Sequence, residues 1–183
     1  KSDAFMSFLG SLIKKIGFSG FLPKGFLRLC NDLLLIPAMW LPGSFLREIF
    51  NRLRGVSIGK NVWIGEGAVL GQHPFLLTIK DNVIISGGVK ILTHDTSFTL
   101  VGGKDLAAEV VIGSNVHIGE NAVILPGVRI GENCVIGASA LVNKDIAPGH
   151  VAAGVPVRIL GTIEEAKKKL EAKIASGKYS STW

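Results

Sequence analysis

The sequence predicts a mainly β fold in which short strands and turns, six residues at a time, stack into one coil. Three observations lead to this prediction. Rows of six residues repeat along the middle of the 183-residue chain, and each row begins with Ile or Val. The fourth position of most rows is Asn, Gly, Ser or Asp, which are turn-forming residues. The chain also has 23 glycines and 48% hydrophobic residues but only 7% aromatic ones, as a regular stack of small aliphatic side chains requires.

The rows fall into three blocks. Their first residues are Ile58, Ile64, Ile79, Ile85, Ile91, Ile112, Ile118, Ile124, Ile130, Ile136 and Val142. The fifth position is small or β-branched, as in Val62 and Ala122. The fourth position, as in Asn61 and Asn115, tolerates a left-handed backbone conformation and predicts the corner between two strands. Three rows close a triangular turn of about 18 residues, and stacked turns bury one another's apolar sides.

Charge and composition divide the chain into three parts. We expect an N-terminal helical, apolar and basic segment at residues 1–54, the stacked β domain at 55–160, and a C-terminal helix and tail at 161–183. Residues 1–54 hold eight Lys/Arg against three Asp/Glu, whereas residues 55–160 hold seven against eight. The β domain therefore lacks the basic stripe and the aromatic platform of a nucleic-acid-binding protein. Two distant cysteines, Cys30 and Cys134, argue against a disulfide scaffold and favour a reducing, cytoplasmic location.

Two apolar stripes predict helices in the N-terminal segment. One stripe, in a helix that we expect Ser44 to cap, is Phe45, Leu46, Ile49, Phe50 and Leu53; the other is Phe5, Phe8, Leu9, Leu12, Ile13 and Ile16. No uninterrupted apolar run reaches the ~18 residues needed to span a bilayer. Two roles stay open for these helices. They either cover the open end of the coil or lie on the inner membrane surface, where Trp40 and flanking cations would meet anionic headgroups.

The C-terminal part begins with a capping box formed by Thr162 and Glu165. The residues Ile163, Ala166, Leu170 and Ile174 follow on one side of the predicted helix. We expect this helix to pack on the coil or to contact another subunit, without chemistry of its own.

One row departs from the turn pattern, because His94 occupies the fourth position of the row that begins at Ile91. The next regular row begins at Ile112, so residues 97–111 are expected to leave the coil as a loop. A replaced corner residue followed by an excursion is typical of a functional site on a regular scaffold. The local sequence equally allows an exposed corner histidine. His73, in an irregular link between the first two blocks, is a candidate for lining a substrate pocket.

The repeats resemble the hexapeptide-repeat acyltransferases, in particular the maltose and galactoside acetyltransferase-like group, which includes enzymes that O-acetylate bacterial surface polysaccharides. The resemblance covers residues 55–161 and is strongest in LLTIKDNVIISGGVKILTHDTSF and VAAGVPVRILG. It implies a left-handed parallel β-helix, acetyl-CoA as the acyl donor, a saccharide acceptor, and a homotrimer with active sites between neighbouring subunits. It also implies that His94 is the catalytic residue, beside a protruding loop that helps to form the site.

A histidine at that place suits the transfer of an acetyl group to a hydroxyl. Imidazole titrates near neutral pH, so it can remove the hydroxyl proton during attack and hand it to the departing thiol of CoA. Such an imidazole needs an acceptor for its other nitrogen. Asp95 is our first candidate for that role, and Asp105 and Glu109 in the loop are rivals. Asp105 is also a candidate for binding the acceptor substrate.

The resemblance also indicates where the donor binds. Small residues late in the coil would let the pantetheine arm lie against the backbone, and they are Ala138, Ala140, Ala152 and Gly154. Lys144 and Arg158 would meet the nucleotide phosphates. Where the family usually has Pro-Ala-Lys, this chain has Pro-Val-Arg at residues 156–158, which keeps the cation.

Two other classes of function stay open from the sequence: N-acetylation of an amino sugar or nucleotide-sugar, and a catalytically silent assembly module. We expect no metal site from His73, His94 and His117, because no two of them are closely spaced, as they are in the zinc enzymes with this fold. His117 lies in the sixth position of its row, where we expect a surface residue.

Overall fold

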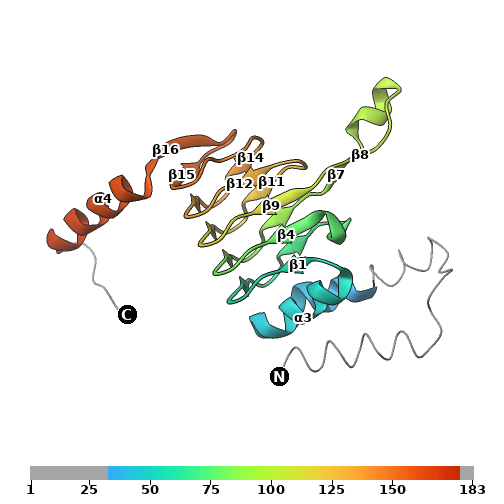
Figure 1. The fold of residues 1–183 in the computed structure, drawn as a ribbon, viewed down its shortest axis with the longest axis horizontal. Helices are drawn as coiled ribbons and strands as arrows, with labels where there is room; N and C mark the ends of the chain where they lie inside the picture. The colour runs from blue at the N-terminus through green and yellow to red at the C-terminus, as the bar shows by residue number, and fades with distance from the viewer. Residues whose placement is uncertain (1–32, 178–183) are drawn as a thin grey trace. The chain divides into compact units, whose positions relative to one another are not determined.

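A parallel β-helix of stacked triangular turns forms the body of the protein in the computed structural model (Figure 1). The structure describes residues 33–177, except the side chains of Phe98 and Val101. The apolar stripe predicted between residues 5 and 16 lies outside the described residues. The coil, the helix before it and the helix after it belong to one compact unit that begins at Leu34.

Each side of the triangle is one sheet of short strands. Sheet A has the order β1 (Ser57–Ile58), β4 (Leu77–Ile79), β9 (Val110–Ile112) and β12 (Arg129–Ile130). Sheet B contains β2 (Trp63–Ile64), β5 (Ile84–Ile85), β10 (His117–Ile118), β13 (Val135–Ile136), β15 (His150–Ala153) and, as an antiparallel edge, β16 (Arg158–Thr162). Sheet C has β3 (Val69–Leu70), β6 (Lys90–Ile91), β11 (Val123–Ile124) and β14 (Leu141–Val142).

The register of the strands is the register of the six-residue rows. Ile64 pairs with Ile85, and Ile118 pairs with both Ile85 and Ile136 in neighbouring turns. These first-position residues are fully buried, and together with the fifth-position residues they fill the core. The prediction of a stacked coil whose first and fifth positions face inward is confirmed.

The fourth position forms the corners, as predicted. In the described part of the chain, six non-glycine residues have a positive φ between 53° and 58°, and all of them occupy this position: Asn61, Asn82, Asn115, Asn121, Asn133 and Ser139. The side chains of Asn61, Asn82, Asn115 and Asn133 form a ladder, in which each amide donates to the next at 3.1 Å. The glycines of the second position serve close packing between turns, since a Cβ on Gly113 would lie 2.7 Å from the carbonyl carbon of Gly131.

The longest excursion from the coil lies at the corner between sheets C and A. Strand β7 (His94–Asp95) leaves the coil and pairs with β8 (Leu106–Ala107) as an antiparallel hairpin, with the 3₁₀ helix η2 (Ser97–Val101) between them. Figure 1 shows this hairpin projecting from the body beside β9. The excursion therefore starts at His94 and ends before Val110, slightly earlier at both ends than the predicted loop at 97–111.

Helix α3 (Ser44–Arg54) covers the first turn of the coil with its polar side. Arg47, Asn51 and Arg54 are only 6%, 0% and 7% exposed. Ser44 does not cap this helix, because Gly43 holds the N-cap position. The Ser44 hydroxyl instead accepts the backbone N–H of Ile64 at 2.7 Å.

The physical reason lies in the open edge of the first turn. A strand with no preceding neighbour leaves backbone groups without partners, and only polar side chains can satisfy them. Arg47 Nε donates to the carbonyl of Ile64 at 2.8 Å, and Arg54 donates to the carbonyls of Leu70 and Gly71 at 3.3 and 2.7 Å. The helix thus covers the coil's end through hydrogen bonds, and its apolar side is left facing outward.

Two further helical elements complete the described chain. The 3₁₀ helix η1 (Pro74–Leu76) lies against α3 at the corner between sheets C and A. Helix α4 (Ile163–Ala175) follows β16, and the predicted capping box of Thr162 and Glu165 is confirmed, with both hydrogen bonds formed. The start of α4 lies against β15 and β16, but none of its residues is fully buried in the single chain. Among the helices that the structure describes, none combines the length and the hydrophobicity needed to cross a bilayer.

Candidate active site

His94 lies in a column of fourth-position residues along the corner between sheets C and A. The first residues of the four rows on this side pair from turn to turn, in the order Leu70, Ile91, Ile124 and Val142. The fourth position of each row lies three residues after its first, so the column consists of His73, His94, Gly127 and Asp145. His73 therefore occupies the same position as His94, one turn earlier. A row counted from Leu70 would have shown this in the sequence, but Pro74 in its fifth position hides the repeat.

The two histidine rings contact each other. Their centroids are 5.3 Å apart and their planes make an angle of 75°, which is an edge-to-face arrangement. His73 also lies 5.8 Å from the ring of Phe75. The sequence suggested His73 as a substrate-binding residue, and the structure brings it next to His94.

The Nδ1 atom of His94 is buried and has no hydrogen-bond partner among the described residues. The residue as a whole is only half-buried, so another part of it reaches the surface. A neutral imidazole carries its proton on one nitrogen and a lone pair on the other. A buried N–H without an acceptor is costly, so the single chain does not favour placing that proton on Nδ1.

Thr93 joins the parts of this site. Its side chain is fully buried, and its Oγ1 accepts the backbone N–H of His73 at 2.9 Å. Its carbonyl accepts the N–H of Ala108, at the return of the hairpin, at 3.0 Å. One residue thus links His73, His94 and the base of the hairpin. Sequence reasoning did not find Thr93, although a threonine directly before an out-of-place histidine is unusual in these rows.

The three acidic candidates for orienting His94 are placed differently. The Asp95 carboxylate accepts the backbone N–H of Ser97 at 2.8 Å and turns the chain into η2. Hydrogen bonds from the side chain and the backbone of Ser97, with a smaller effect of nearby His94, hold the pKa of Asp95 below its ordinary value. Glu109 forms an ion pair with Arg129 at 2.7 Å. Asp105 is exposed in the hairpin. None of the three donates to or accepts from the buried Nδ1, so the assignment of Asp95 stays a prediction.

The residues predicted to bind the donor separate into two groups. Ala138, Lys144, Gly154 and Arg158 are exposed, so each can meet a bound molecule. Ala140 and Ala152 are fully buried, and their side chains face the core. These two side chains pack inside the coil, and the role of the two alanines beside a pantetheine arm stays a prediction.

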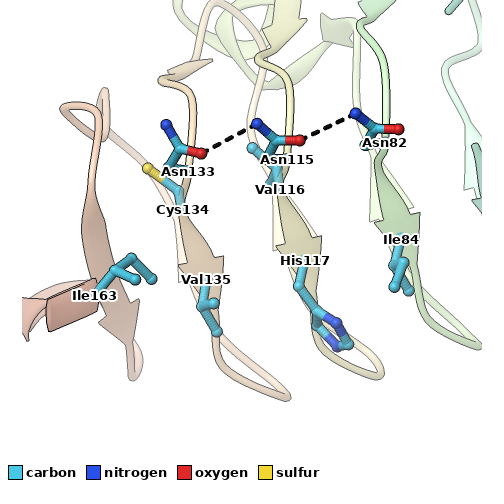
Figure 2. Close-up of a pocket in the computed structure, with 9 residues that line it drawn as sticks. All are labelled: Asn82, Ile84, Asn115, Val116, His117, Asn133, Cys134, Val135 and Ile163. Atoms are coloured by element: carbon cyan, nitrogen blue, oxygen red, sulfur yellow. Dashed lines mark hydrogen bonds between the residues drawn. The ribbon is translucent and has the colours of Figure 1, made fainter. Parts of the chain in front are cut away.

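A separate groove lies at the corner between sheets A and B (Figure 2). It has a volume of about 290 Å³ and lies along the asparagine ladder, with Ile84, Val135 and Ile163 on its other side. His117 lies in it as an exposed residue of β10, which confirms the predicted surface position. Cys134 is buried there, with its Sγ 3.2 Å from the carbonyl of Ala147. The groove does not contain His94 and offers no pair of groups suited to acyl transfer.

Within residues 33–177, no three His, Cys, Asp or Glu side chains gather in a way that could hold a metal ion.

Comparisons with known proteins agree with this architecture. Residues 109–144 match the model of the bacterial transferase hexapeptide family, with six repeats. The chain is 34% identical over 147 residues to galactoside O-acetyltransferase of Escherichia coli K12, and the match covers 68% of this chain and 70% of that protein.

Two solved structures show the same fold. A galactoside acetyltransferase in complex with coenzyme A has 29% identity and a TM-score of 0.63, over 81% of this chain and 88% of the other. A maltose O-acetyltransferase from Clostridium difficile 630 has 26% identity and a TM-score of 0.59, over 76% and 86%. The fold class predicted from the repeats is confirmed, and the parallel sheets are consistent with the left-handed coil of this class.

Proposed function

The chain belongs to the hexapeptide-repeat transferase family and is an acyltransferase, and from this premise we propose that it transfers the acetyl group of acetyl-CoA to a hydroxyl group of a saccharide. Similar proteins are named for galactoside and maltose as acceptors, and one similar structure contains coenzyme A. The observation that carries the proposal is the position of His94. It is an imidazole at the corner where the β7–β8 hairpin leaves the coil, and its ring contacts a second histidine. Its buried Nδ1 has no hydrogen-bond partner among the described residues.

His94 acts as the general base in a direct transfer. A sugar hydroxyl is a weak nucleophile until its proton is removed, and imidazole can accept that proton as the oxygen attacks. A C–O ester bond forms, the C–S thioester bond breaks, and the proton passes through His94 to the departing thiolate. The transfer involves no covalent intermediate on a cysteine of the described residues 33–177, because Cys134 is buried in the core, away from this corner.

The site is incomplete in a single chain. To accept the hydroxyl proton on its outer nitrogen, His94 must carry its own proton on Nδ1, and that N–H needs an acceptor. We infer that a neighbouring subunit supplies this acceptor directly, or that contact with the subunit moves the β7–β8 hairpin so that Asp95 or Asp105 supplies it. Exposed apolar residues on β2, β5 and β16 support self-association as a trimer, and they include Trp63 (48% exposed), Ile84 (43%) and Leu160 (61%).

The exposed residues late in the coil fit the donor. Lys144 and Arg158 are surface cations that suit the phosphates of a nucleotide. Ala138 and Gly154 expose backbone with little side chain over it, against which a pantetheine arm can lie. Bound in this way, acetyl-CoA supplies the activated acetyl group, and the protein supplies the base and the orientation.

The test is an assay of CoA thiol release by the full chain, given acetyl-CoA and a panel of saccharides, with mass spectrometry of the product. We expect release that depends on the saccharide, an acetyl ester in the product, and a loss of roughly 10²–10⁴-fold in kcat for His94→Ala. Unchanged turnover in this variant would reject His94 as the base. An acetyl amide in the product would reject O-acetylation, and absence of acceptor-dependent release would leave an assembly module as the better description.

A further inference from the structure

The N-terminal end of the described chain carries an apolar surface with no partner. On α3, Phe45 is 63% exposed and Leu46 is 37% exposed. On the helical stretch at residues 33–40, Ile36 is 68% exposed and Trp40 is 58% exposed. We call these four side chains the N-terminal apolar surface. Large side chains exposed together at one end of a protein indicate a binding surface rather than random exposure.

The orientation of α3 is not free to change. Residues 47, 51 and 54 lie on the side of the helix opposite to residues 45 and 49, because a helix has 3.6 residues per turn. Arg47 and Arg54 hold the polar side on the coil through the carbonyls of Ile64, Leu70 and Gly71. Rotating the helix to bury its apolar side would leave those carbonyls, and the guanidinium groups, without partners. The apolar side must therefore be covered by something other than the coil.

We propose that the N-terminal apolar surface binds an anionic membrane surface, the cytoplasmic leaflet of a bilayer. Charge is the argument for lipid as the occupant. The preceding residues 1–32 contain five Lys/Arg against two Asp/Glu, and five of the nine phenylalanines of the chain, whereas residues 55–160 have a net charge of −1. Cations next to Phe and Trp side chains suit the boundary between anionic headgroups and acyl chains. A second copy would carry the same positive net charge in its residues 1–32, which disfavours a second copy as the occupant.

The same geometry relates the membrane to the active site. Helix η1 lies against α3, and a Cβ on Gly55, directly after α3, would lie 3.9 Å from the backbone nitrogen of Phe75. Phe75 is 72% exposed, and its ring contacts His73, which contacts His94. Docking through α3 thus brings the histidine column near the lipid surface. The acceptors would then be saccharides that are carried at the membrane, a consequence that rests on the proposed function. Lipid binding itself does not depend on catalysis.

The test is flotation of the full chain with two kinds of vesicles, one of phosphatidylcholine alone and one in which about a third of the lipid is phosphatidylglycerol. We expect binding to the anionic vesicles only, weakened by salt. A variant with Ile36→Glu, Trp40→Glu and Phe45→Glu should bind about tenfold or more weakly, because it loses the inserted side chains and gains negative charge. These residues are exposed, so the variant should fold and release CoA in solution as the wild type does.

The matched control is a variant with Leu170→Glu and Ile174→Glu in α4. These side chains are also apolar and exposed, at 53% and 40%, but they lie at the other end of the chain. We expect this variant to bind vesicles nearly as the wild type does. Equal losses in both variants would show general electrostatic repulsion and would overturn the assignment to α3, as would failure of the wild type to bind anionic vesicles.

Two alternative occupants would give other results. In a variant with Trp63→Phe and Trp183→Phe, Trp40 is the only tryptophan left, so tryptophan fluorescence reports on it alone. We expect its emission to shift to shorter wavelength and to resist aqueous quenchers only after anionic vesicles are added. If Trp40 were protected from the quencher without lipid at every protein concentration, residues 1–32 would cover the N-terminal apolar surface. Protection that grows with protein concentration, together with a larger species in light scattering, would mean a second copy. Either result overturns the proposal.

Discussion

Replacement of Thr93 by valine tests how the histidine column is held. Thr93 is fully buried, its Oγ1 accepts the N–H of His73 at 2.9 Å, and its γ-methyl packs close to Gly71. Valine keeps the shape and the γ-methyl but removes the acceptor. The N–H of His73 then loses its partner in a partly buried place, which costs about 1–3 kcal/mol in the free energy of unfolding.

The effect on catalysis follows from the same contact. Without the bond to Thr93, the backbone of His73 can move, and its ring no longer holds the ring of His94 in one orientation. A loss of about 1 kcal/mol in transition-state stabilisation corresponds to roughly fivefold in kcat. Thr93→Val should thus lower both stability and kcat, with little change in KM for acetyl-CoA.

Thr93→Ser is the matched control, because serine keeps the acceptor oxygen and loses only the methyl group. It should cost about 1 kcal/mol of stability for the buried methyl and leave kcat close to that of the wild type. Urea unfolding gives the free energies, and steady-state CoA release gives kcat and KM. Equal losses of kcat in the two variants would show that packing matters and the hydrogen bond does not. A wild-type kcat in Thr93→Val would refute the positioning role.

Two further predictions concern the end of the coil and the start of the hairpin. Arg54→Met should lower the free energy of unfolding by about 2–4 kcal/mol in urea, because the carbonyls of Leu70 and Gly71 lose a buried donor. Arg129→Met, which removes only an exposed ion pair with Glu109, should stay within about 1 kcal/mol of the wild type, and an equal loss would contradict the edge-capping role. The Asp95 carboxylate, whose pKa is lowered mainly by Ser97, should stabilise the turn above its unfolded pKa, and this contribution should disappear as pH falls through the lower folded value. In an NMR titration the Ser97 amide should move together with the Asp95 carboxyl at a midpoint below 3.8, and a midpoint at or above 3.8 would be incompatible with that hydrogen bond.

The corners of the coil show what a local pattern can predict. Asn61, Asn82 and Asn115 occupy left-handed corners because their short polar side chains tolerate that conformation, and this preference is visible in the sequence alone. The inward position of Ile85 or Ile118 follows in the same way from the six-residue period. The place of His94, at the corner where the coil opens, was predicted from its departure from that period, and only the exact start of the excursion differed.

Helix α3 shows what the same reasoning left open. Its apolar stripe predicted an amphipathic helix that either covers the end of the coil or lies on a membrane, and the expected cap by Ser44 is wrong. The structure turns Arg47, Asn51 and Arg54 inward, because the first turn of a coil has unpaired backbone groups that apolar side chains cannot satisfy. An amphipathic pattern shows that a helix has two faces, but not which neighbour each face meets.

The sequence by itself determined the stacked β architecture, its corners and the exceptional place of His94, since each of these follows from residue preferences within a row of six. Only the tertiary structure decided that His73 meets His94 and that Thr93 joins them. These features depend on contacts between residues in successive turns, which are about 18 places apart along the chain where the coil is regular. Such contacts exist only after the turns have stacked, and they depend on register, open edges and the inserted hairpin together.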